Sequence, residues 1–452
     1  MTAGRLLPQI IRFSVPLAAS GILQLLFNAA DLIVVGKFAG SEPLAAVGAT
    51  SSLIGLFVNA FVGISVGVNV LVARYLGCRQ EDSVSRTIHS AFALGLVMGG
   101  LVLLLGFTLA QPLLRMMDTP ESILPLSSLY MRIYFLGVPG SILYNFGAAV
   151  LQAFGDTKRP FIFLAISGVT NALLNLFFVI VLHMDVAGVA LATIISQYIS
   201  VFLIVRCLVR AEGCGHLNLR GIRLNRQDAL SVLQVGVPAG LTSVIFNISN
   251  VIIQSTINAF GAAVVAANTA ACNIEGFCYT ATNAASLAAI TFTSQNLGAG
   301  KYDRIRRIFL CCLAAVLLIG LPLCLAAWLL GPQLLSIYVS KADASYATII
   351  ACGMKRILRL SAIEFLCGWM EVCCGMVRGL GKTWMPTLVS VCGACGLRLV
   401  WIATIFRADP RLETLYLSYP VSWIVTAVFH AVCYFFICRR LRHKTAEAAD
   451  IS

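Results

Sequence analysis

The sequence predicts an all-α polytopic membrane protein with twelve transmembrane helices, in two six-helix lobes related by an internal repeat. Three observations predict this fold class. The chain has 452 residues, of which 59% are hydrophobic and 11% charged, whereas a soluble protein carries about 25% charged residues. Its apolar runs are about 20 residues long or longer, which suits helices rather than barrel strands. Features of the first half also recur in the second.

The recurring segments lie at nearly constant spacing, with offsets of 226, 221 and 222 residues. The matching pairs are 151–160 with 377–386, Leu76-Gly77 with Leu297-Gly298, and Ser14-Val-Pro16 with Gly236-Val-Pro238. A repeat of this length is a duplicated half-protein rather than a solenoid unit. In an apolar chain, duplicated halves point to a transporter whose site lies between or inside them.

Twelve apolar runs predict the spans, because a backbone in lipid must satisfy its own hydrogen bonds and therefore forms helices. The expected spans are 9–36, 44–76, 86–111, 125–152, 160–182, 186–209, 229–256, 263–296, 303–330, 350–378, 384–406 and 415–438. The first is not a cleaved signal peptide, since it is too long, contains Asn28 and Asp31, and has a counterpart in mid-chain.

Basic residues predict the orientation of these spans. With the N-terminus inside, the inner segments hold 21 Lys and Arg residues and the outer loops hold five. This asymmetry is the positive-inside pattern, and it predicts a multi-pass protein of the cell membrane with both termini in the cytoplasm. The net charge of +13 then reflects topology and attraction to anionic lipid rather than nucleic-acid binding.

An even number of spans per half returns the chain to its starting side, so the two lobes run parallel. Residues 210–228 hold three glycines and several charges without an apolar period, and they predict a cytoplasmic linker. The expected organisation is an N-terminal lobe at 1–209, the linker at 210–228, a C-terminal lobe at 229–438 and a cytoplasmic tail at 439–452.

Polar residues form stripes inside the first-lobe spans. Gln24, Asn28 and Asp31 share one helix face, and Asp31 is the only acid of its span. A charge at the bilayer centre costs about 2.5–3.5 kcal/mol, so such an acid is a functional candidate. It would take up a proton or Na⁺, or face a cationic substrate; the alternative is an Asp that only fixes packing. Further candidates in this lobe are Asn171, Asn175 and Thr193, for which interhelical hydrogen bonding is the alternative.

The second lobe carries longer stripes with acids. Asn250 and Gln254 lie on one face of the seventh span, Glu275 lies in the eighth, and Glu371 follows Glu364 by seven residues in the tenth. These stripes suggest a water-accessible cavity, because a lipid-facing stripe would be too costly. The alternative for Glu371 is a structural ion pair with Arg398 in the eleventh span.

No enzyme motif is present: the chain has no HExxH, no GxSxG and no histidine cluster. We therefore expect a protein that is not an enzyme and needs no cofactor beyond a coupling ion. Its expected partners are small organic compounds and the lipid bilayer, with no nucleic acid, and a monomer is expected.

The chain resembles the multidrug and toxic compound extrusion (MATE) family over essentially its whole length. The similarity rests on the duplicated layout, on Pro16, Gln24, Asn28, Asp31 and Gly36, on the run QNLGAGK at 295–301, and on RGLGKT at 378–383. The resemblance implies a Na⁺- or H⁺-driven antiporter that exports organic, often cationic compounds by alternating access.

The resemblance also implies roles for residues. Asp31 would couple the cation in the N-terminal lobe, with Asn171, Asn175 and Thr193 completing a possible Na⁺ site. Family members often carry an Asp where this chain has Asn175, so Na⁺ would bind less tightly here. In the C-terminal lobe, Glu275 and Glu371 would be the coupling acids.

A second function stays open: a flippase for lipid-linked precursors, of the same superfamily. Such a protein is expected to have a strongly cationic cavity for pyrophosphate. The acids in the expected cavity favour cationic cargo instead.

Overall fold

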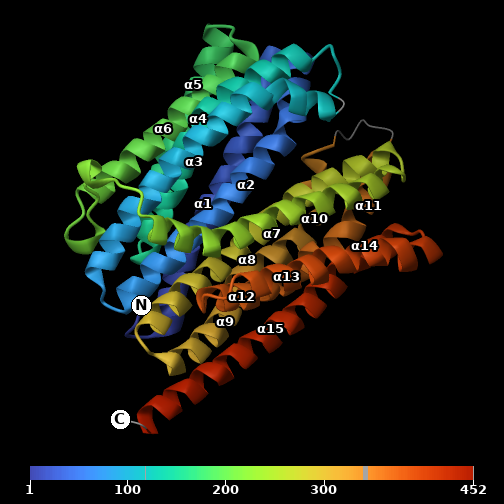
Figure 1. Ribbon diagram of the computed structural model, residues 1–452. Coiled ribbons are helices and arrows are strands. Elements are labelled where there is room, and N and C mark those ends of the chain that lie inside the picture. Colours follow the sequence, from blue (N-terminus) through green and yellow to red (C-terminus); the bar gives the residue numbers. More distant parts are fainter. Residues whose placement is uncertain (118, 340–344, 451–452) are drawn as a thin grey trace. The chain divides into compact units, whose positions relative to one another are not determined.

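The structure is a computed structural model that describes residues 1–117, 119–339 and 345–450; for Ser41, Ser52 and residues 442–450 it describes the backbone only. All regular structure in the described residues is helical (Figure 1). Residues 451–452 of the predicted tail and Lys341 of the predicted outer loops lie outside the described residues.

The first six predicted spans are helices within a few residues of the expected bounds. They are α1 (Leu6–Val34) with η1 (Val35–Ala39), α2 (Ser41–Gly77), α3 (Glu81–Met116), α4 (Leu124–Ala153), α5 (Lys158–Leu176) with η2 (Phe177–Val181), and α6 (Asp185–Val209). Two short 3-10 turns, η3 (Gly213–Gly215) and η4 (Leu219–Gly221), lie in the predicted linker.

The second six spans follow the same order but are more broken. They are α7 (Arg226–Asn258), α8 (Ala262–Gly298), α9 (Tyr302–Leu329), α11 (Tyr346–Arg359) with η5 (Ser361–Ile363) and α12 (Phe365–Gly379), α13 (Trp384–Ser390) through η6 (Val391–Gly396) and α14 (Leu397–Trp401) to η7 (Ile402–Phe406), and α15 (Leu412–Asp450). A short α10 (Gly331–Ser336) precedes α11.

In the described part of the chain, ten helices are long and apolar enough to cross a membrane, or eleven if the bent pair around Glu364 is one span. The predicted span outside this set is the eighth, 263–296, which is α8; it has 37 residues but carries Asn, Thr, Ser and Gln along much of its length. The all-α, multi-pass fold class is thus confirmed.

Backbone geometry repeats with the sequence. The residues with positive φ include Gly40 and Gly261, then Arg79 and Gly300, at an offset of 221 in both pairs. Gly155 (φ 90°) and Gly381 (φ 80°) form a third pair at an offset of 226. Glycine accepts this conformation without strain. The duplicated sequence therefore folds into duplicated turns.

The chain divides into two compact units, and the division does not follow the linker. We call Ala19–Gly240 the N unit, and Met1–Ala18 with Leu241–Ser452 the C unit. The boundary falls inside α1 and inside α7, two residues after Pro16 and Pro238 respectively. The first half-helix of each repeat thus belongs to the unit formed mainly by the other repeat.

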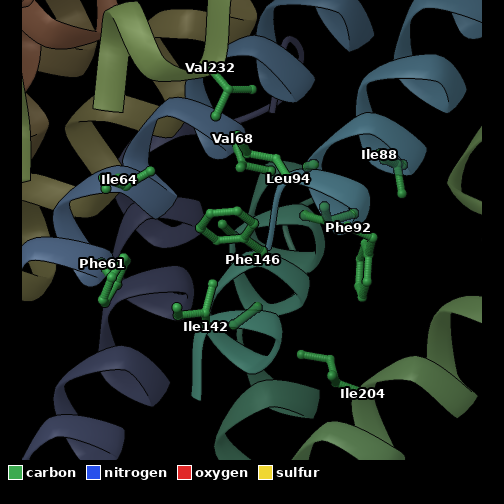
Figure 2. Packing of buried hydrophobic residues seen from close by; sticks show 14 of the residues in the cluster. Phe61, Ile64, Val68, Ile88, Phe92, Leu94, Ile142, Phe146, Ile204 and Val232 are labelled. Atoms are coloured by element: carbon green, nitrogen blue, oxygen red, sulfur yellow. The ribbon is translucent and has the colours of Figure 1, made fainter. Parts of the chain in front are cut away.

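The core of the N unit is a cluster of apolar side chains from α2, α3, α4, α6 and the first half of α7. Figure 2 shows Phe146 of α4 among Ile142, Leu94 and Val68, with Val232 of α7 close by. Between membrane-spanning helices, packing of this kind is stabilised by van der Waals contact and close approach of the helices rather than by removal of apolar surface from water.

The predicted linker lies against α3 of the same unit. Arg86 Nε contacts Asp228 Oδ2 at 2.7 Å, and the Asn218 amide donates to His89 Nε2 at 3.0 Å. Ser90 Oγ donates to the Asn225 carbonyl at 3.1 Å, and the Asn225 amide lies 3.2 Å from the same Oγ. These contacts hold the start of α7 on the N unit.

Candidate ion-coupling and substrate site

Four of the predicted residues meet in the N unit, and we call them the Asp31 cluster: Asp31, Asn171, Asn175 and Thr193. Asn175 Nδ2 donates to Asp31 Oδ1 and lies 3.3 Å from Asn171 Oδ1. Asn171 Nδ2 in turn lies 3.4 Å from Thr193 Oγ1. The structure thus joins side chains of α1, α5 and α6 in one continuous polar chain.

Local helix geometry explains how these side chains reach one another. Asn171 and Asn175 are four residues apart, so both lie on the same face of α5. A π-helical turn follows both α1 and α5. The first, η1, starts four residues after Asp31, and the second, η2, starts two residues after Asn175. Such π turns are frequent at functional sites because they re-aim side chains within a helix.

The cluster offers oxygen atoms to a cation. Asn175 is fully buried, and its Oδ1 is enclosed without a hydrogen-bond partner. The Asp31 carboxylate, Asn171 Oδ1 and Thr193 Oγ1 are the neighbouring oxygens. Carboxylate, carbonyl and hydroxyl oxygens suit hard cations such as Na⁺. The residues present therefore fit a small cation, with Asp31 as the single negative charge.

The other two first-lobe candidates do not join this cluster. Gln24 and Asn28 precede Asp31 on α1, and both residues are exposed. Their spacing from Asp31 is helical, as predicted, but the structure gives them no place among the four clustered residues.

In the C unit, two predicted residues meet in a different network, the Arg356 network: Gln254, Asn268, Glu275 and Arg356. Arg356 Nη2 and Nε lie 2.7 and 3.0 Å from Glu275 Oε2. Arg356 Nη1 donates to Asn268 Oδ1 at 2.9 Å, and Asn268 Nδ2 donates to Gln254 Oε1 at 2.9 Å. The network links α7, α8 and α11.

Arg356 was not among the predicted site residues. Its side chain is 4% exposed and that of Glu275 is 14% exposed, so the pair is largely removed from water. The signal available in the sequence was a basic residue inside the expected span 350–378. Since Glu275 is held by this ion pair, it is not a lone acid of the kind predicted.

Glu371 and Asn250 remain outside the Arg356 network. Glu371 is half-buried on α12, and Asn250 is exposed on α7. The suggested ion pair between Glu371 and Arg398 is wrong: among the ion pairs of the described residues none joins them. Arg398 Nε instead donates to Ser422 Oγ at 2.9 Å.

The most enclosed acid of the C unit is Glu364, which the sequence placed in a stripe but gave no role. It is 1% exposed, and its Oε2 is enclosed without a partner. It lies where the helix pair Tyr346–Ile363 and Phe365–Gly379 bends by 41°. An acid enclosed at a bend inside a span is a candidate functional residue.

Comparison with known proteins agrees with this fold. The MatE family model matches residues 16–177 and 238–404, so each matched segment begins at a repeat proline. The chain is 24% identical over 441 residues to the probable multidrug resistance protein YoeA of Bacillus subtilis (strain 168), covering 95% of this chain and 93% of that protein. It is 28% identical to the probable multidrug resistance protein YpnP of the same organism, covering 84% of each chain.

Solved structures share the fold. A MATE protein in complex with MaL6 superposes with a TM-score of 0.90 at 22% identity, covering 97% of this chain and 98% of that one. The outward-facing conformation of a multidrug resistance MATE transporter of the MOP superfamily also gives 0.90, at 21% identity and 97% coverage of both chains. Because the family model covers most of its length in two repeats, the chain belongs to the MatE family, whose members are transporters and not enzymes.

Proposed function

We propose that this protein exports small organic compounds, chiefly cationic ones, across the cell membrane in exchange for Na⁺ or H⁺, with both termini in the cytoplasm. Export of drugs by secondary transport fits the multidrug resistance and export proteins among its relatives. The observation that carries the ion exchange is the Asp31 cluster, which joins one carboxylate to amide and hydroxyl oxygens within the N unit.

The exchange follows from competition for one negative charge. A cation held by the Asp31 cluster neutralises the carboxylate, and a cationic substrate needs that same charge for its own binding. Enclosure from water strengthens both interactions, because the effective dielectric is lower than in water. Only one of the two is then bound at a time, which produces antiport when the cavity opens alternately to each side.

Energetics limit the stoichiometry. Exchange of one H⁺ for one monovalent cation moves no net charge, so only the pH gradient drives it, at about 1.4 kcal/mol per pH unit. Use of the membrane potential, at about 2.3 kcal/mol per charge per 100 mV, needs a second ion or a less charged substrate. A second acid in the C unit, where Glu364 and Glu371 lie, would allow the second ion.

The alternative, a flippase for lipid-linked precursors, is less well supported. A pyrophosphate group needs several cations facing it, whereas the Asp31 cluster carries a carboxylate and no basic residue.

The test is efflux of fluorescent organic cations by membrane vesicles under an imposed Na⁺ or pH gradient. The Asp31→Asn variant should lose gradient-driven efflux, while Glu42→Gln, which removes an exposed acid of the same unit, should keep it. Unchanged efflux by Asp31→Asn at equal protein level would rule out Asp31 as the coupling group. Efflux of a lipid-linked probe but of no organic cation would favour the flippase.

A further inference from the structure

Arg398 is the largest fully buried side chain of the protein, at 2% exposure. It lies on α14, a single helical turn between the π-helical segments η6 and η7. Its Nε donates to Ser422 Oγ at 2.9 Å, and its Cζ lies 4.2 Å from the centroid of the Tyr419 ring and 6.0 Å from that of Trp423. These partners from α15 hold the guanidinium by one edge and one face.

The other edge of this guanidinium has no acceptor. A guanidinium carries five N–H groups, of which Nε contributes one. Among the hydrogen bonds and ion pairs of the described residues, none involves Nη1 or Nη2 of Arg398. The enclosed, unpartnered polar atoms include Nε of Arg74, Arg132 and Arg378 but no atom of Arg398. Among the described residues, its terminal nitrogens are thus neither hydrogen-bonded nor counted with the sealed, unpartnered polar atoms.

Arg356 is a second buried arginine of the same unit, and its hydrogen-bond acceptors can be compared with those of Arg398. Arg356 is 3% exposed, yet each of its three nitrogens has an acceptor on Glu275 or Asn268. Its Cζ lies 5.3 Å from the Tyr419 ring that Arg398 also contacts. Two guanidinium groups thus share one aromatic ring, while the described ion pairs supply a carboxylate to only one of them.

We propose that Arg398 binds a small monovalent anion from solution, either chloride or the carboxylate group of an organic solute. The Nη1 and Nη2 groups form the fork that grips a carboxylate through two parallel hydrogen bonds. Tyr419 and Trp423 fix the plane of the guanidinium, because it stacks on aromatic faces. An anion supplies the acceptor and the charge that a buried cation otherwise lacks. This site lies within the C unit and does not depend on the proposed role of Asp31.

The test uses the purified, full-length protein and two readouts. Sodium chloride and sodium formate are titrated against sodium gluconate at constant Na⁺, with thermal unfolding and tryptophan fluorescence followed together. Chloride or formate should raise the unfolding midpoint in a saturable way and change the fluorescence. Gluconate should do neither, because its long polyhydroxyl chain is too bulky to bring its carboxylate to a side chain that is 2% exposed. The anion that saturates at the lower concentration identifies its source as inorganic or as a carboxylate.

Variants separate this site from general salt effects. Arg398→Gln should weaken the apparent affinity by about tenfold or more, as expected for lost charge-assisted hydrogen bonds, whereas Arg407→Gln removes an exposed charge nearby and should change nothing. Arg398→Lys keeps a positive charge but loses the planar fork, so it should keep a saturable response to chloride and bind formate more weakly, which preserves the test if Arg398→Gln does not fold. An equal response to all three salts, or no saturable response, would overturn the proposal and leave water as the partner of Arg398.

Discussion

At the scale of single residues, the acids of the two units have different partners. The Asp31 carboxylate accepts a hydrogen bond from the neutral amide of Asn175, whereas the Glu275 carboxylate pairs with the guanidinium of Arg356. A carboxylate with amide neighbours keeps its negative charge available to a mobile cation. A carboxylate in a buried ion pair has its charge already compensated. The N unit therefore offers the better cation site, and the ion pair in the C unit has a structural effect.

A second carboxylate should strengthen the cation site of the N unit. Replacement of Asn175 by Asp places two negative charges beside each other, so a bound cation gains attraction. We expect the half-saturating Na⁺ concentration for driven efflux to fall by about tenfold. Asn59→Asp is the matched control, since it adds the same charge to an exposed position of α2 in the same unit. An equal change in both variants would show a general effect of charge.

Loss of Glu275 should destabilise the C unit. Glu275→Gln leaves the buried Arg356 without a counter-charge, and breaking a buried pair from one side costs about 3–5 kcal/mol. We expect the free energy of unfolding in mixed detergent micelles to fall by that amount. The double variant Glu275→Gln with Arg356→Met should recover much of it.

The adjacent residue provides the control. Lys355 pairs with Glu413 at 2.7 Å, but their side chains are 46% and 28% exposed, so Lys355→Gln should change the free energy of unfolding by less than about 1 kcal/mol. Similar losses in Glu275→Gln and Lys355→Gln would contradict the interpretation of Arg356 as a buried, charge-compensated residue.

The sequence predicted correctly which site residues share a face of one helix. It did not predict which residues of different helices are in contact. Asn171 and Asn175 share a face because they are four residues apart, which any helix imposes. The partner of Glu275 lies 81 residues away on another helix, and no spacing rule reveals it. The suggested partner of Glu371 failed for the same reason, since apolar spans do not disclose how neighbouring helices are rotated.

At the scale of helices, close backbone packing joins α2 to the first half of α7 within the N unit. A Cβ atom on Gly236 would lie 2.5 Å from the Ile64 carbonyl oxygen, and one on Gly67 would lie 2.2 Å from the Val232 carbonyl oxygen. Small residues at such positions let helix backbones approach in membranes. The contact atoms belong to the backbone, so they cannot rotate away.

We therefore expect Gly236→Ala to destabilise the protein. Overpacking against rigid atoms typically costs about 1–3 kcal/mol, measured as a lower unfolding midpoint and a smaller monodisperse fraction. Gly55→Ala on α2 is the control, because nothing lies within 4 Å of its added Cβ and alanine favours helix by up to about 1 kcal/mol. Equal midpoints for the two variants would show that α2 and α7 can separate at no cost.

The helices themselves were largely predictable, because a long apolar run in lipid satisfies all its backbone hydrogen bonds within the segment only as a helix. The departures have physical causes. The tenth span is broken at Glu364, where a 3-10 turn separates α11 from α12. The eleventh contains two π-helical segments, η6 and η7. Hydropathy reports the length of a run but not the hydrogen-bond register within it.

At the scale of the whole molecule, the two prolines mark where the units meet along the chain. α1 and α7 each pass from one unit to the other two residues after an interior proline. Proline removes one backbone hydrogen bond and kinks a helix, which lets the two parts of that helix change angle. Alternating access requires such a change.

Replacement of Pro238 by Ala should therefore slow transport more than it weakens binding. We expect the maximal efflux rate to fall by about tenfold while the half-saturating substrate concentration stays within about twofold, the pattern of a hindered conformational step. Pro322→Ala is a suitable control, since Pro322 lies inside α9, a helix that belongs to the C unit over its whole length. Equal losses in both variants would indicate a general effect of helix straightening.

The position of the unit boundary also bears on how such a chain arose. Residues Leu6–Ala18 of the first repeat are packed in the C unit, and residues Arg226–Gly240 of the second are packed in the N unit. Two separate copies of one ancestral repeat, assembled in this way, form a domain-swapped dimer with exchanged initial half-helices. In this chain the same exchange is intramolecular. Neither repeat expressed alone can complete its own unit.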